Sequence, residues 1–102
     1  MDLIYTVEEI TNKLKPIFDN CGVTKVILFG SYAKGIATAK SDIDLVVGVE
    51  DWVDIFDFSA ISVDVTSTLG KEIDFLPMDD VILDSYVDKE IKNTGRLIYE
   101  KS

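Results

Sequence analysis

Short apolar segments rich in β-branched residues alternate along this chain with segments of helical periodicity, and this alternation constrains the fold most. Thr6 and Glu9 form a capping box that opens the first helical segment. The predicted elements are helix 7–20, strand 23–29, one or two helical turns within 31–36, strand 42–47, helix 54–69, strand 72–76, helix 79–93 and strand 96–99. Such a pattern predicts an α/β (α+β) fold, with a small mixed sheet of about four strands flanked by helices.

Two of these elements carry conflicting signals. Pro16 removes a backbone hydrogen bond within the first helix, so that helix is expected to bend or break there. Residues 61–65 alternate like a strand, but the length of segment 54–69 and the helix-ending Gly70 favour a helix. With 102 residues and no linker or internal repeat, the chain is expected to form one domain, 1–102.

Charge and composition exclude several classes of function. The chain has 19 acidic and 10 basic residues, a net charge of −9, and no histidine. Catalysis by Ser-His-Asp or Cys-His groups is therefore excluded within this chain, and binding to duplex nucleic acid is disfavoured by charge repulsion. An anionic ligand would need a hard divalent cation, Mg²⁺ or Mn²⁺, to mediate its binding. A single cysteine, with no membrane-spanning run or signal peptide, predicts a cytoplasmic protein without a membrane partner.

The most informative segment joins Gly30-Ser31 to Asp42-Ile43-Asp44. A Gly-Ser pair between a strand and a helical turn lets the backbone approach a ligand, with N–H groups that suit phosphate oxygens. Asp42 and Asp44 are two residues apart on the predicted strand, so their side chains share one face. Their α-carbons would be about 6.5–7 Å apart, close enough for the carboxylates to share one divalent ion or a pair of ions.

Asp74 adds a third carboxylate if its strand lies beside that of Asp44. It stands in the apolar run 73–76, where an uncompensated carboxylate is costly. Three carboxylates beside a phosphate-binding turn are typical of two-metal nucleotidyl transfer, in which the third accepts the proton of the attacking hydroxyl. The ordinary structural alternatives are that Asp42 caps a turn, that Asp44 and Asp74 face solvent, and that Gly30 simply ends a strand.

The spacing of these residues resembles a known signature. Gly30-Ser31, ten residues, and then Asp42-Ile43-Asp44 is similar to the G-S-x10-D-x-D motif of the DNA polymerase β-like nucleotidyltransferase superfamily. The short length and the C-terminal pattern over 91–100 resemble the minimal nucleotidyltransferases in particular. These are single-domain prokaryotic proteins that are often paired with a helical HEPN-domain protein. Some act as antitoxins that transfer AMP from ATP onto a tyrosine of that partner.

The resemblance implies a role for each motif residue. Gly30 and Ser31 would hold the nucleotide phosphates, Asp42 and Asp44 would ligate Mg²⁺, and Asp74 would complete the metal site and act as the base. Lys34 stands where the family often has arginine, and a surface charge is the alternative for it.

The function expected from this resemblance is Mg²⁺-dependent transfer of a nucleoside monophosphate, AMP from ATP, to a tyrosine of a HEPN partner within a hetero-oligomer. One alternative is a non-catalytic antitoxin or scaffold that acts by binding alone. Another is transfer to a small molecule such as an aminoglycoside. Because three clustered carboxylates are not needed for folding, the intact motif favours the enzyme.

Overall fold

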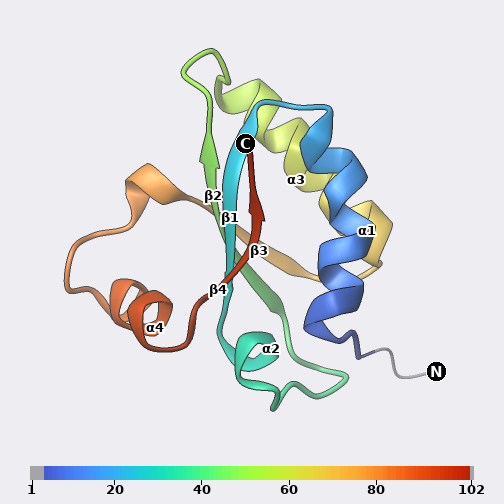
Figure 1. Cartoon of the computed structure of the whole chain (residues 1–102), viewed down its shortest axis with the longest axis vertical. Helices are drawn as coiled ribbons and strands as arrows, with labels where there is room; N and C mark the ends of the chain where they lie inside the picture. Colours follow the sequence, from blue (N-terminus) through green and yellow to red (C-terminus); the bar gives the residue numbers. More distant parts are fainter. Residues whose placement is uncertain (1–3, 102) are drawn as a thin grey trace.

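A four-stranded mixed sheet of order β3-β2-β1-β4 forms the centre of the computed structural model, which describes residues 4–101 (Figure 1). The helices are α1 (Val7–Asp19), α2 (Ser31–Lys34), α3 (Ile55–Leu69) and α4 (Tyr86–Thr94), with a 3₁₀ turn, η1 (Met78–Asp80). The strands are β1 (Val23–Phe29), β2 (Ile43–Val49), β3 (Ile73–Pro77) and β4 (Arg96–Glu100). The predicted mixed sheet of four strands flanked by helices is thus confirmed.

Strand pairing aligns the ends of three strands. β1 pairs in antiparallel fashion with both β2 and β4, whereas β2 and β3 are parallel and are connected through α3. In this register Phe29 lies opposite Asp44, and Asp44 lies opposite Asp74. The C-terminal end of β1 therefore meets the N-terminal ends of β2 and β3 at one level of the sheet.

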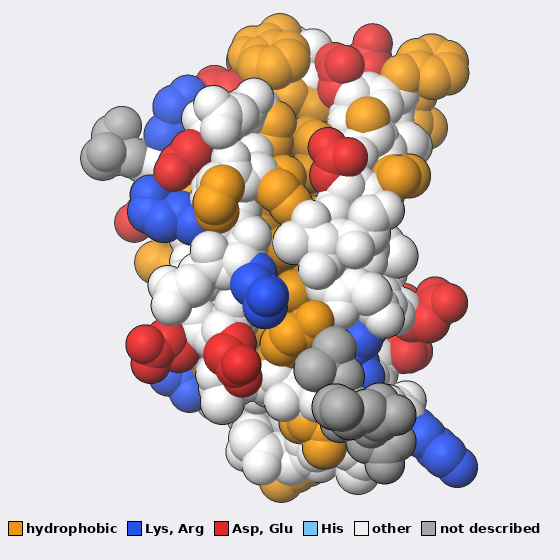
Figure 2. Space-filling model, turned by 90° about the vertical axis from the view of Figure 1, so that its right-hand side faces the viewer, with side chains coloured by type: hydrophobic (Ala, Val, Ile, Leu, Met, Phe, Trp, Pro, Cys, Tyr) orange, Lys and Arg blue, Asp and Glu red, His pale blue; other side chains and the backbone are white. Residues whose placement is uncertain are grey.

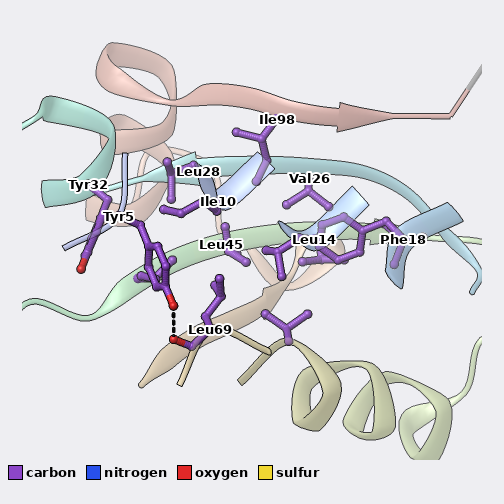
Figure 3. Close-up of a cluster of buried hydrophobic side chains, with 14 of the residues drawn as sticks. Tyr5, Ile10, Leu14, Phe18, Val26, Leu28, Tyr32, Leu45, Leu69 and Ile98 are labelled. Carbon is purple, nitrogen blue, oxygen red and sulfur yellow. Dashed lines mark hydrogen bonds between the residues drawn. The ribbon is translucent and has the colours of Figure 1, made fainter. Parts of the chain in front are cut away.

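The two faces of the sheet are covered by different helices. α1 and α3 cover one face and α4 lies on the other (Figure 1). On the first face Leu14 and Phe18 of α1 pack on Val26, Leu28 and Leu45 of the sheet (Figure 3). Side chains alternate between the two faces of a strand, so Ile27 and Val46 lie on the opposite face of the sheet. There they line a surface with Ile91 of α4. The main core is therefore built on the α1/α3 face, which leaves the α4 face available for a site.

The N-terminal caps explain where the two long helices begin. The Thr6 side chain accepts a hydrogen bond from the Glu9 N–H at 3.0 Å, and Asp54 caps α3 in the same way from Asp57 at 2.9 Å. The helical interpretation of residues 54–69 is thus confirmed over the strand-like alternative. α1 continues through Pro16, so the break considered there does not occur.

The last predicted helix begins later than expected. Residues 78–80 form only the 3₁₀ turn, and α4 starts at Tyr86, where the Ser85 hydroxyl accepts a hydrogen bond from the Asp88 N–H. Asp84 has a positive φ of 63°, which is incompatible with a continuous helix from residue 79. The prediction of helix 79–93 is therefore wrong at its start, because Ser85 outcompetes Asp79 and Asp80 as the cap.

No helix within residues 4–101 is long and apolar enough to cross a membrane. The face that carries α1 and α3 shows acidic and basic side chains interspersed with apolar ones, rather than a continuous basic patch (Figure 2).

Replacing Leu14, which is fully buried, with alanine should lower the free energy of unfolding by about 2–5 kcal/mol, because a cavity opens in the main core. The matched control is Val63→Ala on the exposed side of α3, which should change it by less than about 0.5 kcal/mol. Urea denaturation monitored by circular dichroism measures both. Equal losses for the two variants would contradict the assignment of the core to this face.

Candidate active site

A pocket of about 620 Å³ opens on the α4 face, at the level where β1 ends and β2 and β3 begin. Its volume lies within the range of small-molecule sites. The sheet, α2, the segment after α2 and α4 all contribute to its wall. The lining residues are Phe29, Gly30, Ser31, Lys34, Ile36, Asp44, Asp74, Leu76, Tyr86, Val87 and Glu90. Four of the five predicted site residues are therefore brought together in one pocket.

Asp44 and Asp74 form the centre of this pocket. They are directly opposite on the parallel strands β2 and β3, which confirms that the two strands are neighbours. Burial is the main cause that raises the pKa of Asp44 to about 7, and a hydrogen bond to the Asp74 carboxylate adds to the rise. The charges of Asp74, Asp42 and Glu90 raise it further. Without a cation, a substantial fraction of the Asp44 carboxyl is therefore protonated near neutral pH.

Gly30 makes room for the Asp44 carboxylate. Its φ of 76° lies in the left-handed region, and a β-carbon at this position would collide with Oδ2 of Asp44. α2 begins at the next residue, Ser31, and the first N–H groups of a helix have no partner within it. The Gly30-Ser31 turn thus brings the backbone at the start of α2 next to the Asp44 carboxylate.

Asp42 differs from the prediction. It lies one residue before β2 instead of on the strand, its side chain is exposed, and it does not line the pocket. Within residues 4–101, no group of three or more His, Cys, Asp or Glu side chains has the arrangement of a metal site. Asp42 is nevertheless close enough for its charge to act on Asp44. Its role as a metal ligand stays a prediction.

The donor set of the pocket fits a hard divalent cation. Carboxylate oxygens are the preferred protein ligands of Mg²⁺ and Mn²⁺, and the Asp44–Asp74 pair provides them at one point. The charges of Asp74, Asp42 and Glu90 act together to raise the pKa of Asp44, and a cation bound beside Asp44 would relieve this repulsion.

Three residues of α4 complete the pocket, and sequence reasoning missed them. Glu90 Oε1 lies 2.9 Å from Nζ of Lys34 and accepts a hydrogen bond from the Tyr86 hydroxyl at 3.0 Å, while Val87 lies on the same helix face. The Lys34 hydrogen bond lowers the pKa of Glu90 and, reciprocally, raises that of Lys34. Lys34 is therefore part of the pocket wall. The spacing of Tyr86, Val87 and Glu90 indicated a shared helix face, but no sequence signal indicated what that face covers.

Comparison with known proteins identifies the family. The family model described as polymerase beta, nucleotidyltransferase, matches residues 12–102, which is most of the chain. The chain belongs to this nucleotidyltransferase family. The matched range includes every residue that lines the pocket, Gly30 and Glu90 among them. The resemblance to this superfamily is thus confirmed, and the protein is a nucleotidyltransferase; its superfamily generally uses a divalent metal ion.

Two sequence relatives are similar over most of their lengths. Protein adenylyltransferase MntA of Thermococcus cleftensis is 31% identical over 75 residues, which cover 70% of this chain and 76% of the relative. MJ0128 of Methanocaldococcus jannaschii, a candidate protein adenylyltransferase, is 32% identical over 100 residues, covering 97% of this chain and 99% of the relative.

Two solved structures share the fold. A chain of a toxin–antitoxin crystal structure with AMP-PNP matches with a TM-score of 0.72 and 22% identity, covering 90% of this chain and 74% of that chain. A structure of the tri-AMPylated Shewanella oneidensis HEPN toxin in complex with its MNT antitoxin gives a TM-score of 0.68 and 19% identity, with coverages of 94% and 74%.

The stability of the metal-free nucleotidyltransferase should depend on Asp44. Because folding raises the pKa of this carboxyl from its usual 3.8 to about 7, its favourable contribution is complete below pH 3.8 and is lost as the pH rises through 7. Asp44→Asn should therefore gain stability relative to the wild type as the pH rises from 3.8 to about 7. The expected gain is about 1 kcal/mol after allowance for solvent screening. Urea unfolding in EDTA measures it, and a pH-independent difference would contradict it.

Gly30→Ala and Gly35→Ala form a matched pair. Both glycines have a positive φ, 76° and 74°, so each substitution should cost about 1 kcal/mol of stability. A β-carbon at Gly35 meets nothing within 4 Å, whereas one at Gly30 displaces Asp44. Only Gly30→Ala should weaken binding of Mn²⁺, measured by titration calorimetry, by tenfold or more. Equal weakening in both variants would show that Gly30 does not serve the carboxylate pair.

Proposed function

We propose that this nucleotidyltransferase transfers AMP from ATP to a hydroxyl, specifically that of a tyrosine on a HEPN-domain toxin, and so acts as the antitoxin. The names of its sequence relatives support protein adenylylation, since both are described as protein adenylyltransferases. The fold similarity to an MNT antitoxin in complex with an AMPylated HEPN toxin supports the class of partner. ATP as the donor is supported by the same fold in a complex with AMP-PNP.

The observation that carries the proposal is the contact between Asp44 and Asp74 beside the Gly30-Ser31 turn. A divalent cation bound there, Mg²⁺ in the cell or Mn²⁺, would neutralise the phosphate charge and polarise the α-phosphate. Gly30 and Ser31 bind the phosphate oxygens through backbone N–H groups and the Ser31 hydroxyl. Asp44 and Asp74 would hold the cation, with Asp42 as the third ligand in this proposal.

The transfer step needs a base that the acceptor can reach. The acceptor oxygen forms a bond to the α-phosphorus as the bond to the pyrophosphate oxygen breaks, and Asp74 accepts the proton of the acceptor hydroxyl. β3 is an edge strand and the Asp74 side chain is exposed. A tyrosine delivered by a separate protein can therefore approach Asp74, which is consistent with a hetero-oligomer in which the partner supplies the acceptor.

Intact mass spectrometry of the native complex tests this proposal. The protein is purified with its bound partner from the source cell and incubated with Mg²⁺-ATP. The partner should gain mass in whole AMP units with the wild type, and the rate should fall at least 10²-fold with Asp44→Asn, because the cation loses a ligand. Asp79→Asn, an exposed carboxylate outside the pocket, is the matched control and should leave the rate unchanged.

The other outcomes separate the alternative functions. A stable partner that gains no mass would contradict transfer and favour an antitoxin that acts by binding alone. If the protein purifies without a protein partner and transfers AMP to an aminoglycoside, this result would favour a small-molecule acceptor.

A further inference from the structure

We propose that Ile36, Leu76, Tyr86 and Val87, which we call the apolar rim, bind the nucleobase by stacking and apolar packing, so that the enzyme tolerates different bases. This inference rests on the proposed function in one respect: it takes the Gly30-Ser31 turn and the Asp44–Asp74 pair as the triphosphate end of the pocket. The rim is the remainder of the same cavity, apart from Phe29 and the Lys34–Glu90 ion pair.

The register of β3 fixes where the rim begins. Leu76 follows Asp74 by two residues, so the two side chains lie on the same face, about 6.5–7 Å apart along the strand. α4 stands over this face and contributes Tyr86 and Val87. A nucleotide whose phosphates and cation lie at Asp74 and Asp44 therefore has its nucleoside beside an apolar surface of the same pocket.

Tyr86 has the properties of a stacking platform. Its side chain lines the pocket and is 76% exposed, so one side of the ring is open to a ligand. Its hydroxyl donates to Glu90, and Glu90 is held in turn by Lys34 across the pocket. A ring that is exposed but fixed at its hydroxyl can stack on a base with little loss of side-chain freedom. Ile36, which is 67% exposed, provides a second uncovered apolar surface.

The polar side chains that line the pocket have other partners or roles than hydrogen bonding to the edge of a base. Asp44 and Asp74 are engaged with each other, and Lys34 and Glu90 form an ion pair. Ser31 lies at the turn assigned to the phosphates. Among the described residues that line the pocket there is no Asn, Gln, Thr or His that could pair with a base edge. Because every base has an aromatic face, stacking without such side chains gives affinity with little selectivity.

Titration calorimetry in Mg²⁺ with ATP, GTP, CTP, UTP and inorganic tripolyphosphate tests the rim. The wild type should bind all four nucleotides with dissociation constants within about tenfold of each other, and more tightly than tripolyphosphate. Tyr86→Ala should weaken binding of every nucleotide by about tenfold and leave tripolyphosphate unchanged, because only the base contacts the ring. Tyr86→Phe keeps the ring and should stay within about threefold of the wild type. Ile82→Ala, exposed but outside this pocket, is the control.

Each contrary result has a separate meaning. Equal weakening of nucleotide and tripolyphosphate binding by Tyr86→Ala would overturn the base assignment, as would a preference for one base well above tenfold. Wild-type protein that binds ATP no more tightly than tripolyphosphate would overturn it too. If all four nucleotides bind more tightly than tripolyphosphate and Tyr86→Ala removes this difference, but no AMP reaches any acceptor, the proposed function alone is overturned and the rim stands.

Discussion

The carboxyl groups of Asp44 and Asp74 meet across the parallel pairing of β2 and β3, and the organisation of the site depends on this contact. Two carboxylates placed side by side, of which Asp44 is half-buried, repel each other unless a proton or a cation lies between them. The fold tolerates this cost because the main core lies on the opposite face, under α1 and α3. A bound cation would turn the unfavourable pair into a binding site for an anionic substrate.

The surrounding elements supply what such a pair needs. Gly30 lets the β1–α2 turn approach Asp44 without a steric collision, and α2 then directs backbone N–H groups outward. On the far side of the pocket, Glu90 of α4 reaches Lys34 and joins the two walls by an ion pair. The cavity between them has charged residues in one part and apolar residues in another. This division matches the charged phosphates and the aromatic base of a nucleotide.

Much of this arrangement could be predicted from local sequence, and the exceptions have physical causes. The ends of β1 and α3 followed from Gly30, Asp54 and Gly70, because caps and turns are encoded within a few residues. The start of α4 was misjudged because three residues, Asp79, Asp80 and Ser85, can all cap a helix, and only the positive φ of Asp84 decides among them.

Contacts between residues far apart in the sequence could not be predicted from local patterns. The spacing of Gly30, Ser31, Asp42 and Asp44 indicates a candidate site, but the contact of Asp74 with Asp44 depends on strand order, which no local pattern encodes. The contact of Glu90 with Lys34 joins residues 56 positions apart, and nothing in the spacing of α4 indicated it. The apolar residues from Ile43 onward predict a strand with Asp42 at its start, whereas β2 begins one residue later, at Ile43.

Anomalous diffraction from crystals grown with Mn²⁺ tests the central claim most directly. The account predicts a manganese peak that is coordinated by carboxylate oxygens of both Asp44 and Asp74 and lies next to the Gly30-Ser31 turn. It also predicts that this peak disappears in Asp44→Asn crystals. A peak bound elsewhere, or no peak between Asp44 and Asp74 in saturating Mn²⁺, would contradict this assignment.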